Sequence, residues 1–192
     1  MAPTSVYSDK HRISTLPDRI RLDRRYDAQR LKRDVHDITS SLTQQFYVYY
    51  SPVLLVSDVT EPAEHDWAKE PMLKGCLYLQ EVLAGIEAEI KSVRLMRLEA
   101  GAELKEHTDP MLDAIHQDIV RLTLPVFSDA HVLFLLNGTE VPMKPGELWY
   151  MRLSAPHSVH NNSVHERINI SIDVVWNDWL DDWLRVGISS KP

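Results

Sequence analysis

The sequence has almost no cysteine and no long apolar run, and each absence excludes a class of structure. Cys76 is the only cysteine among the 192 residues, which excludes an internal disulfide and any cysteine-rich zinc site. Any bound metal must therefore be held by nitrogen and oxygen ligands. No apolar run approaches the roughly 20 residues that cross a bilayer, and residues 1–12 show no apolar export segment. We therefore expect a cytoplasmic protein without a membrane partner.

The sequence also lacks the positive charge of a general nucleic-acid-binding protein. Its formal net charge is −7 at pH 7, so no nucleic-acid partner is expected. The charge is unevenly spread, because residues 10–33 contain nine Lys and Arg residues against three acidic residues. Two interpretations of this basic stretch remain open. It is either an arm for an anionic partner, or a first strand followed by the solvated face of a helix.

Two helices and a strand are predicted in the first half of the chain. Apolar residues recur at helical spacing within residues 27–42, which predicts an amphipathic helix. They are Leu31, Val35, Ile38 and Leu42. The aromatic segment "QFYVYY" (residues 45–50) predicts a strand ended by Pro52. Residues 70–90 predict a second helix despite two internal glycines. Its apolar residues are Leu73, Leu77, Leu79, Val82, Leu83, Ile86 and Ile90.

After Lys91 the pattern changes to short segments, many of them alternating, separated by Gly, Pro and Asn. The predicted strands lie in "SVRLMRLEAG", "IVRLTLPVF", "AHVLFLLNGTEVPM", "GELWYMRL" and "ERINISIDVVW". Asn137 and Gly138 predict a two-residue hairpin turn, because both residues tolerate a positive φ. Short strands that follow a helical segment predict a mainly β, α+β fold, namely a barrel or jelly roll braced by helices.

A last apolar stripe predicts a short C-terminal helix. Its members follow helical spacing and are Trp176, Trp179, Leu180, Trp183 and Leu184. Core packing is one interpretation of this stripe, and a lid or the seam of a homodimer is the other. No repeat or long linker divides the chain, so we expect one domain over residues 1–192. Its expected parts are a flexible arm (1–16), a helical and strand preface (17–92), a jelly-roll core (93–176) and a C-terminal helix with a tail (177–192).

The segment "EHTDP" (residues 106–110) places a histidine and an aspartate two positions apart. Side chains at i and i+2 of a strand point the same way, so we expect His107 and Asp109 to face one cavity. His157 follows 48 residues after Asp109, where a barrel can return the chain to the same cavity mouth. Two histidines and one carboxylate occupy one face of an octahedron and leave three positions open, which is typical of non-haem Fe(II) oxygenases.

Arg167 begins the alternating segment "RINISIDVV", ten residues after His157. Its face of the strand would also carry Asn169, Ser171 and Asp173, opposite an apolar face of Ile168, Ile170, Ile172 and Val174. An arginine on such an inward face is costly to bury without an anion. A dicarboxylate cosubstrate that chelates iron through its 2-oxo acid end would supply the missing carboxylate in a forked geometry.

Together these motifs resemble the aspartyl/asparaginyl β-hydroxylase family of Fe(II)/2-oxoglutarate-dependent dioxygenases, which includes bacterial proline hydroxylases. The resemblance rests on "RLMRLEAGAELKEHTDP", "VRLTLPV", "NGTEVPMKPGELWYMRLSAPHSVHN" and "RINISIDV", and it covers about residues 17–185. It implies a double-stranded β-helix (jelly-roll) fold. It also implies an enzyme that hydroxylates an unactivated C–H bond, with 2-oxoglutarate and O2 converted to succinate and CO2.

Carried over residue by residue, the resemblance implies that the iron ligands are His107, Asp109 and His157. It implies Arg167 as the anchor of 2-oxoglutarate. Arg121 in "VRLTLPV" matches a position that faces the active site, towards a substrate or cosubstrate carboxylate. His160 lies close to His157 in sequence, but the family pattern aligns the first of these two histidines. The remaining candidates are read as loop, surface or capping residues, and they are His116, His131 and His165.

Asp109 separates this sequence from two other groups of enzymes. The animal aspartyl hydroxylases lack the carboxylate ligand, and so do halogenases, in which chloride binds in its place. The sequence is therefore similar to the bacterial amino-acid hydroxylases, and the expected substrate is an amino acid or a molecule derived from one. Candidate wall residues for that substrate are Arg94, Trp149 and Asn161, and each of them also fits a purely structural role.

Three alternatives remain open at this point. The same chemistry could act on a residue within a peptide or on a carrier-bound amino acid. A cupin-like enzyme or binding protein could use the same barrel and metal without oxygen chemistry, because fold alone does not determine function. Finally, a structural jelly roll could carry His107 and Asp109 in a solvated loop.

Overall fold

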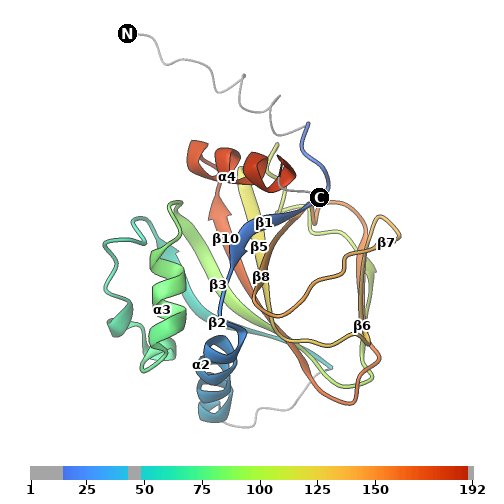
Figure 1. Cartoon of the computed structure of the whole chain (residues 1–192), viewed down its shortest axis with the longest axis horizontal. Helices are drawn as coiled ribbons and strands as arrows, with labels where there is room; N and C mark the ends of the chain where they lie inside the picture. Colours follow the sequence, from blue (N-terminus) through green and yellow to red (C-terminus); the bar gives the residue numbers. More distant parts are fainter. Residues whose placement is uncertain (1–14, 43–48, 190–192) are drawn as a thin grey trace.

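The computed structural model describes residues 15–42 and 49–189, which form two antiparallel β-sheets with helices packed on one of them (Figure 1). The larger sheet contains β1 (Arg19–Arg25), β2 (Tyr50–Val59), β3 (Ile90–Leu98), β5 (Ile119–Phe127), β8 (Glu147–Met151) and β10 (Arg167–Val175). The smaller sheet contains β4 (Glu103–His107), β6 (Val132–Leu136), β7 (Thr139–Glu140) and β9 (His157–Asn161). Their spatial orders are β1-β8-β5-β10-β3-β2 and β4-β9-β6-β7. The facing sheets confirm the predicted jelly roll.

Alternation along β10 separates an apolar layer from a polar one. Ile170 and Ile172 are fully buried on the outer face of the larger sheet, where they join the main hydrophobic core. Arg167, Asn169 and Ser171 point the other way and line a cavity between the two sheets. One strand thus packs against the core with one face and presents polar groups to a cavity with the other, as its sequence predicts.

The helices lie against the outer face of the larger sheet (Figure 1). α2 (Ala28–Ser41) begins after Asp27, whose carboxylate accepts hydrogen bonds from two backbone N–H groups of the first turn. As predicted, α2 buries Leu31, Val35 and Ile38. α3 (Leu77–Ala84) packs against α2, and α4 (Asp178–Ser189) packs against β1. Within the described ranges, no helix has the length and apolar character needed to span a membrane.

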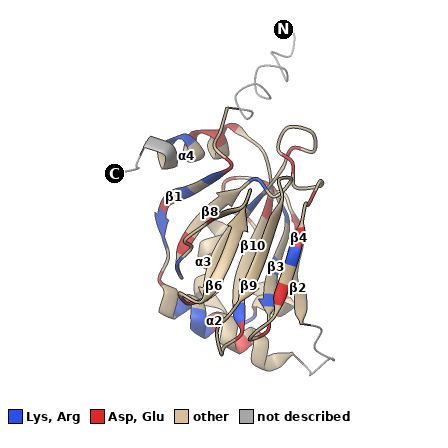
Figure 2. Cartoon of the chain, turned by 90° about the vertical axis from the view of Figure 1, so that its right-hand side faces the viewer, with Lys and Arg blue, Asp and Glu red and all other residues tan. Residues whose placement is uncertain are grey.

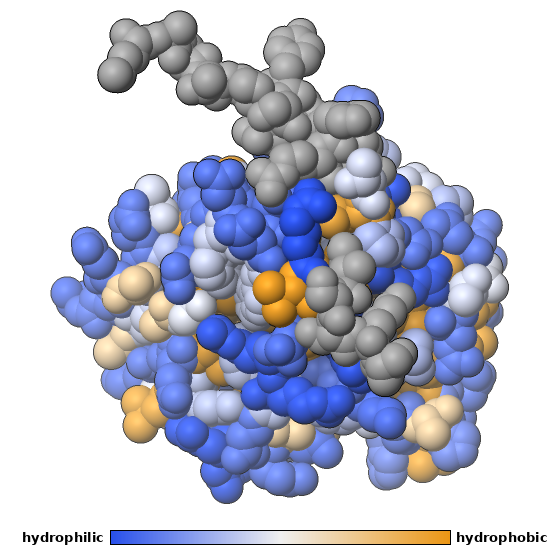
Figure 3. Space-filling view, turned by 45° about the horizontal axis from the view of Figure 1, so that its top comes forward, coloured by the Kyte–Doolittle hydropathy of each residue, from blue (hydrophilic) through white to orange (hydrophobic). Residues whose placement is uncertain are grey.

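The C-terminal helix α4 docks through the apolar stripe identified in the sequence. Leu180 and Leu184 are fully buried, and the three tryptophans of the stripe pack against the main core. The visible surface of the face that includes α4 is mostly hydrophilic, with hydrophobic residues in small separate areas (Figure 3). Core packing is therefore confirmed for the stripe, whereas a lid or a homodimer seam stays a prediction.

Most of the basic stretch that the structure describes lies in β1 and α2. On β1, the buried Ile20 and Leu22 alternate with charged residues, which Figure 2 shows in blue and red. Two arginines of this strand pair with the buried Glu147 of β8. This part of the stretch is a strand followed by a helix face. Lys10 and Arg12 lie outside the described residues, and binding of an anionic partner stays a prediction.

The helix predicted over residues 70–90 is wrong in its extent. The structure divides this range into a 3₁₀ turn, η2 (Pro71–Leu73), the helix α3 and the start of β3, and another such turn, η1 (Trp67–Lys69), precedes it. Gly75 has a φ of 84°, a conformation that ends a helical run. Leu77 was placed in the apolar stripe, yet its side chain is 70% exposed at the start of α3.

The prediction that this strand ends at Pro52 is also wrong. β2 begins at Tyr50 and continues through Pro52 to Val59. β2 is an edge strand of the larger sheet, where the missing N–H of a proline costs no ladder hydrogen bond if it faces away from the neighbouring strand. Residues 45–48 of the predicted strand lie outside the described residues. Near the N-terminus, residues 1–16 were expected to form a flexible arm, but Leu16 is buried.

The hairpin between β6 and β7 turns at the predicted pair of residues. Asn137 has a φ of 50° and Gly138 a φ of 68°, which are the positive values that a type I′ turn requires. The asparagine side chain also donates a hydrogen bond of 2.8 Å to the carboxylate of Asp18. The turn therefore ties the smaller sheet to the segment that leads into β1.

Gly146, just before β8, supports a testable prediction about stability. Its φ is 82°, and a Cβ placed there would overlap the carbonyl oxygen of Tyr26. The N–H of Tyr26 in turn donates a hydrogen bond of 2.8 Å to the carbonyl of Gly146. We expect Gly146→Ala to lower the free energy of unfolding by at least about 2 kcal/mol, since strain and overlap add. Gly138→Ala is the matched control, because its φ is also positive but its surroundings are open. Urea unfolding should give a clearly smaller loss for the control, and equal losses would contradict the steric argument.

Candidate metal centre

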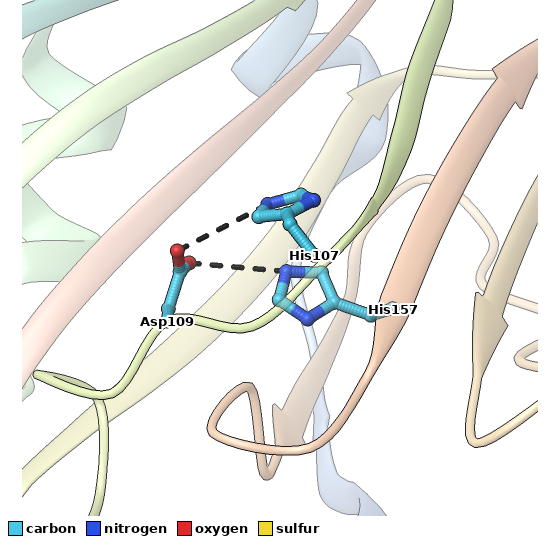
Figure 4. Close-up of side chains that lie close together, drawn as sticks. All are labelled: His107, Asp109 and His157. Carbon is cyan, nitrogen blue, oxygen red and sulfur yellow. Dashed lines mark ion pairs between the residues drawn. The ribbon is translucent and has the colours of Figure 1, made fainter.

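Strands β4 and β9 bring the three predicted ligands together (Figure 4). His107 ends β4, His157 begins β9, and the two residues are cross-strand partners. Oδ1 of Asp109 lies 3.9 Å from Nε2 of His107, and Oδ2 lies 3.8 Å from Nε2 of His157. One atom of each of the three residues falls within 4.8 Å of the others. Two histidine nitrogens and a carboxylate oxygen at this spacing can hold a single metal ion.

Asp109 reaches this position differently from the way the sequence predicts. β4 ends at His107, so the alternation of side chains along a strand does not orient Asp109. Its backbone N–H instead donates a hydrogen bond of 2.8 Å to the carbonyl of Leu153, and its carbonyl accepts one of 2.9 Å from Leu112. The carboxylate is therefore positioned by a turn that is anchored to the segment leading into β9.

Both histidine rings are oriented for coordination through Nε2. Nδ1 of His107 lies 2.7 Å from the carbonyl oxygen of Lys105, and Nδ1 of His157 lies 3.0 Å from that of Ala155. A carbonyl oxygen can only accept, so each Nδ1 carries the hydrogen and each Nε2 keeps its lone pair. Burial lowers the pKa of His157, and its backbone hydrogen bond opposes this shift. A lowered pKa favours the neutral imidazole, which is the form that binds a metal.

The three side chains line a cavity between the two sheets, with an empty volume of about 420 Å³ that includes its mouth. The other polar residues that line the cavity come from the larger sheet and are Arg121, Thr123, Arg167, Asn169 and Ser171. The apolar and aromatic lining residues are Tyr50, Met96, Leu104, Phe134, Met151, Leu153 and Val159. Polar groups that converge beside an apolar wall are typical of a site for a small molecule.

Arg167 is a buried cation in this cavity. Its side chain is 5% exposed, and burial lowers its pKa to about 10, so the guanidinium is still charged at neutral pH. No carboxylate among the described residues forms an ion pair with it. The side-chain oxygen of Asn169 faces the guanidinium when both groups of that amide are satisfied. A buried arginine with only a neutral partner is suited to bind the carboxylate of a ligand.

Arg121 faces the same cavity but already has a partner. Its Nε and Nη2 donate hydrogen bonds of 2.6 and 2.8 Å to the two carboxylate oxygens of Asp173. Its Nη1 lies 3.8 Å from Oδ2 of Asp109. Only this third nitrogen of the guanidinium is directed towards the candidate metal centre. The role of Arg121 towards a carboxylate of a substrate or cosubstrate stays a prediction.

The three candidate substrate residues occupy different surroundings. Arg94 lies on the inner face of β3, and its Nη1 donates a hydrogen bond of 3.0 Å to Asp173. Trp149 and Asn161 do not line the cavity. The indole of Trp149 donates to Glu147 within a buried cluster, and the amide of Asn161 donates to three backbone carbonyl groups. The structure therefore brings only Arg94 close to the site.

Three further histidines, His116, His131 and His160, pair with carboxylates outside the candidate metal centre. His160 lies one residue before the end of β9, and its Nδ1 is 3.7 Å from Glu103. His131 contacts Asp129 at the surface with its Nδ1 3.2 Å from the carboxylate, as expected of a capping residue. His116 pairs with Asp113 in a loop. His157 rather than His160 thus joins the ligand cluster.

Sequence reasoning missed most of the apolar lining of the cavity. The ring of Phe134 stacks on His157, with 6.0 Å between centroids and 9° between planes, and the alternation of "AHVLFLL" could have indicated that it points inward. Tyr50 was missed because the strand was expected to end just after it. Burial raises the pKa of Tyr50, and the charges of Arg121 and Arg167 oppose that shift.

Several solved structures are similar to this chain in fold. SnoK, a non-heme alpha ketoglutarate dependent carbocyclase from nogalamycin biosynthesis, has a TM-score of 0.57 at 11% identity, with 90% of this chain and 84% of that chain covered. AviO1 from Streptomyces viridochromogenes has a TM-score of 0.54 at 14% identity, with 93% of this chain and 98% of that chain covered. An oxidoreductase of the 2OG-Fe(II) oxygenase family from Burkholderia pseudomallei has a TM-score of 0.51 at 11% identity, with 90% of this chain and 91% of that chain covered. Identities this low show a shared fold only.

The family of this chain is shown by its amino-acid sequence rather than by its fold. No curated protein matches the chain significantly. The model of the family described as Aspartyl/Asparaginyl beta-hydroxylase matches residues 44–177. That range is well over half of the chain, and it contains both strands of the candidate metal centre together with Arg167. The protein therefore belongs to the aspartyl/asparaginyl beta-hydroxylase family, and it is a dioxygenase.

Proposed function

We propose that the protein is an Fe(II)/2-oxoglutarate-dependent hydroxylase of an amino acid or of a substrate derived from one. The observation that carries the proposal is a single cavity that contains both a His-Asp-His cluster and the buried Arg167, which forms no ion pair with a carboxylate of the described residues. Iron bound there with 2-oxoglutarate would supply the O2-dependent oxidation of an unactivated C–H bond, with succinate and CO2 as the other products.

The side chains would divide this work between them. His107, Asp109 and His157 would hold the iron and leave the remaining coordination positions open. Arg167 would pair with the far carboxylate of 2-oxoglutarate and so set the direction in which that molecule lies. The apolar wall, which includes Phe134 beside His157, would exclude water. It would also fix which carbon of the substrate lies nearest the iron, and this placement selects the product.

Arg94, on the inner face of β3, favours a substrate with a carboxylate. Arg94 and Leu54 are cross-strand neighbours, and Leu54 is 51% exposed while the Arg94 side chain is 36% exposed. Arg94 and Arg121 share the single carboxylate of Asp173, so the charge of Arg94 is only partly compensated. A free amino acid would place its carboxylate at Arg94 and an apolar side chain near Leu54.

A second form of substrate is favoured by the surface next to His107. An open groove runs along Ala102–His107 beside Tyr49, and β4 is an edge strand of the smaller sheet. An edge strand can pair with an extended peptide, whose main chain then supplies the hydrogen bonds. The same hydroxylation could therefore act on a residue within a peptide laid along β4.

The cosubstrate site can be tested without knowing the substrate. Purified protein is mixed with Fe(II) and then titrated with 2-oxoglutarate in the absence of oxygen, and the visible spectrum is recorded. We expect the charge-transfer band of a chelated 2-oxo acid, which saturates near one equivalent. Absence of the band, with no iron retained, would contradict the proposed function.

The two forms of substrate give different results in one further assay. Free amino acids, their carboxamides and short peptides are incubated with Fe(II), 2-oxoglutarate and O2, and products that gain one oxygen are found by mass spectrometry. Conversion of a free amino acid but not of its carboxamide supports recognition of a carboxylate at Arg94. Conversion of peptides alone supports the groove along β4 instead.

A further inference from the structure

The carboxylate of Asp173 is the most heavily bonded side chain beside the candidate metal centre. Asp173 is 5% exposed and accepts four hydrogen bonds. Two come from Arg121, at 2.6 and 2.8 Å, one comes from Arg94 at 3.0 Å, and one comes from the hydroxyl of Ser92 at 2.9 Å. In the proposed function Asp173 appears only as the carboxylate that Arg94 and Arg121 share, although it lies on the same face of β10 as Arg167.

These bonds determine where the third nitrogen of Arg121 lies. A guanidinium is a rigid planar fork, so engagement of Nε and Nη2 by Asp173 also places Nη1. That atom is 3.8 Å from Oδ2 of Asp109, which is beyond hydrogen-bonding distance. Arg121 is thus held between two carboxylates, bound firmly to Asp173 and kept just short of Asp109.

We propose that Asp173 is a positioning residue that holds Arg121 away from Asp109 and so keeps the Asp109 carboxylate available to a metal. The inference rests on the proposed function, because it assigns Asp109 to a metal centre. Arg121 is buried and needs an anionic partner. Without Asp173, the nearest carboxylate is that of Asp109, and closing the gap would form an ion pair that competes with the metal for the same oxygen.

The test measures metal affinity rather than turnover. Co(II) is titrated anaerobically into the full-length protein and followed by its visible absorption. Asp173→Asn keeps the size of the side chain but removes its charge. We expect the dissociation constant for Co(II) to rise roughly ten- to hundredfold, the range found when partners of metal ligands are changed.

A second buried aspartate supplies the matched control. Asp181 in α4 is 3% exposed and accepts two hydrogen bonds from Arg185, at 3.0 and 2.9 Å. Asp181→Asn should lower the stability of the protein about as much as Asp173→Asn does. It should, however, leave the affinity for Co(II) unchanged. Any loss of affinity in both variants would indicate a general effect of destabilisation and would overturn the inference.

Removing the competing arginine tests the direction of the effect. Adding Arg121→Met to Asp173→Asn should restore the Co(II) affinity to within about threefold of the original protein. Arg121→Met alone should bind Co(II) at least as tightly as the original protein, and this variant keeps the test decisive if Asp173→Asn fails to fold. Weakened binding in Arg121→Met would mean that Arg121 supports Asp109 rather than competing for it. If the unaltered protein binds no Co(II), the proposed function itself fails, whereas tight binding by Asp173→Asn overturns only the positioning role.

Discussion

His157→Ala is expected to abolish stoichiometric binding of Fe(II), whereas His160→Ala is expected to retain it. The two histidines lie on the same short strand, β9, but only His157 has its Nε2 directed at Asp109, at 3.8 Å. His160 instead faces Glu103 at the edge of the smaller sheet. Removing a direct ligand should weaken binding by more than the ten- to hundredfold that follows from changing the partner of a ligand. Turnover of 2-oxoglutarate should fall with it.

Iron content after anaerobic gel filtration and the Fe(II) dissociation constant measure this difference. Thermal unfolding of both metal-free variants serves as the control for folding. A small change in stability is expected for His157→Ala, because the ring is buried in a cavity wall rather than in the main core. Retention of one iron per chain by His157→Ala, or its loss from His160→Ala, would show that the ligand set has been assigned incorrectly.

The clustering of His107, Asp109 and His157 was predictable from the sequence, and their role as metal ligands stays a prediction. His107 and Asp109 are close in sequence, and β9 must run beside β4 in a jelly roll, which brings His157 to the same point. The alternation of side chains along a strand does not account for the direction of Asp109, because β4 ends at His107. Its direction comes from a backbone hydrogen bond to Leu153, and no local pattern reveals a contact between residues so far apart.

The errors in the fold have a common physical cause. The apolar spacing in residues 70–90 suits a helix, but Gly75 adopts a positive φ and Ile90 is taken into a sheet. Tertiary packing therefore overrides a local pattern. Pro52 was read as a strand terminator, although an edge strand tolerates proline. Whether a strand lies at an edge is a property of the whole sheet, which one segment does not show.

Asp173 illustrates the same limit at the site. The alternation of "RINISIDVV" places it on the inward face together with Arg167, so its direction was predictable. Its partners come from two other strands, β3 and β5, because the register Asp173↔Ser92 and Asp173↔Arg121 brings them opposite one another. Register follows from the bulges and turns of the complete sheet, so the network could be found only in the structure.

Arg167→Met is expected to weaken binding of 2-oxoglutarate by roughly thirtyfold or more while leaving the ligand-free protein as stable as before, or more stable. Truncating one partner of a buried charge pair costs about 2–5 kcal/mol, and each 1.4 kcal/mol is a tenfold change in affinity. Without a ligand, however, the buried charge has no carboxylate partner within residues 15–42 and 49–189, and burial opposes its ionisation. Replacing an uncompensated buried charge by an apolar side chain of similar length removes that cost.

Arg97→Met supplies the contrast, because this equally buried arginine pairs with Glu166 at 2.8 and 3.1 Å. It should lose about 1–3 kcal/mol of stability and bind 2-oxoglutarate as the original protein does. Anaerobic titration of the charge-transfer band gives the affinities, and urea unfolding without ligand gives the stabilities. A large loss of stability in Arg167→Met would mean that its charge supports the fold. Opposite changes in affinity and stability would instead mean that the fold tolerates an unfavourable buried charge because the cosubstrate compensates for it.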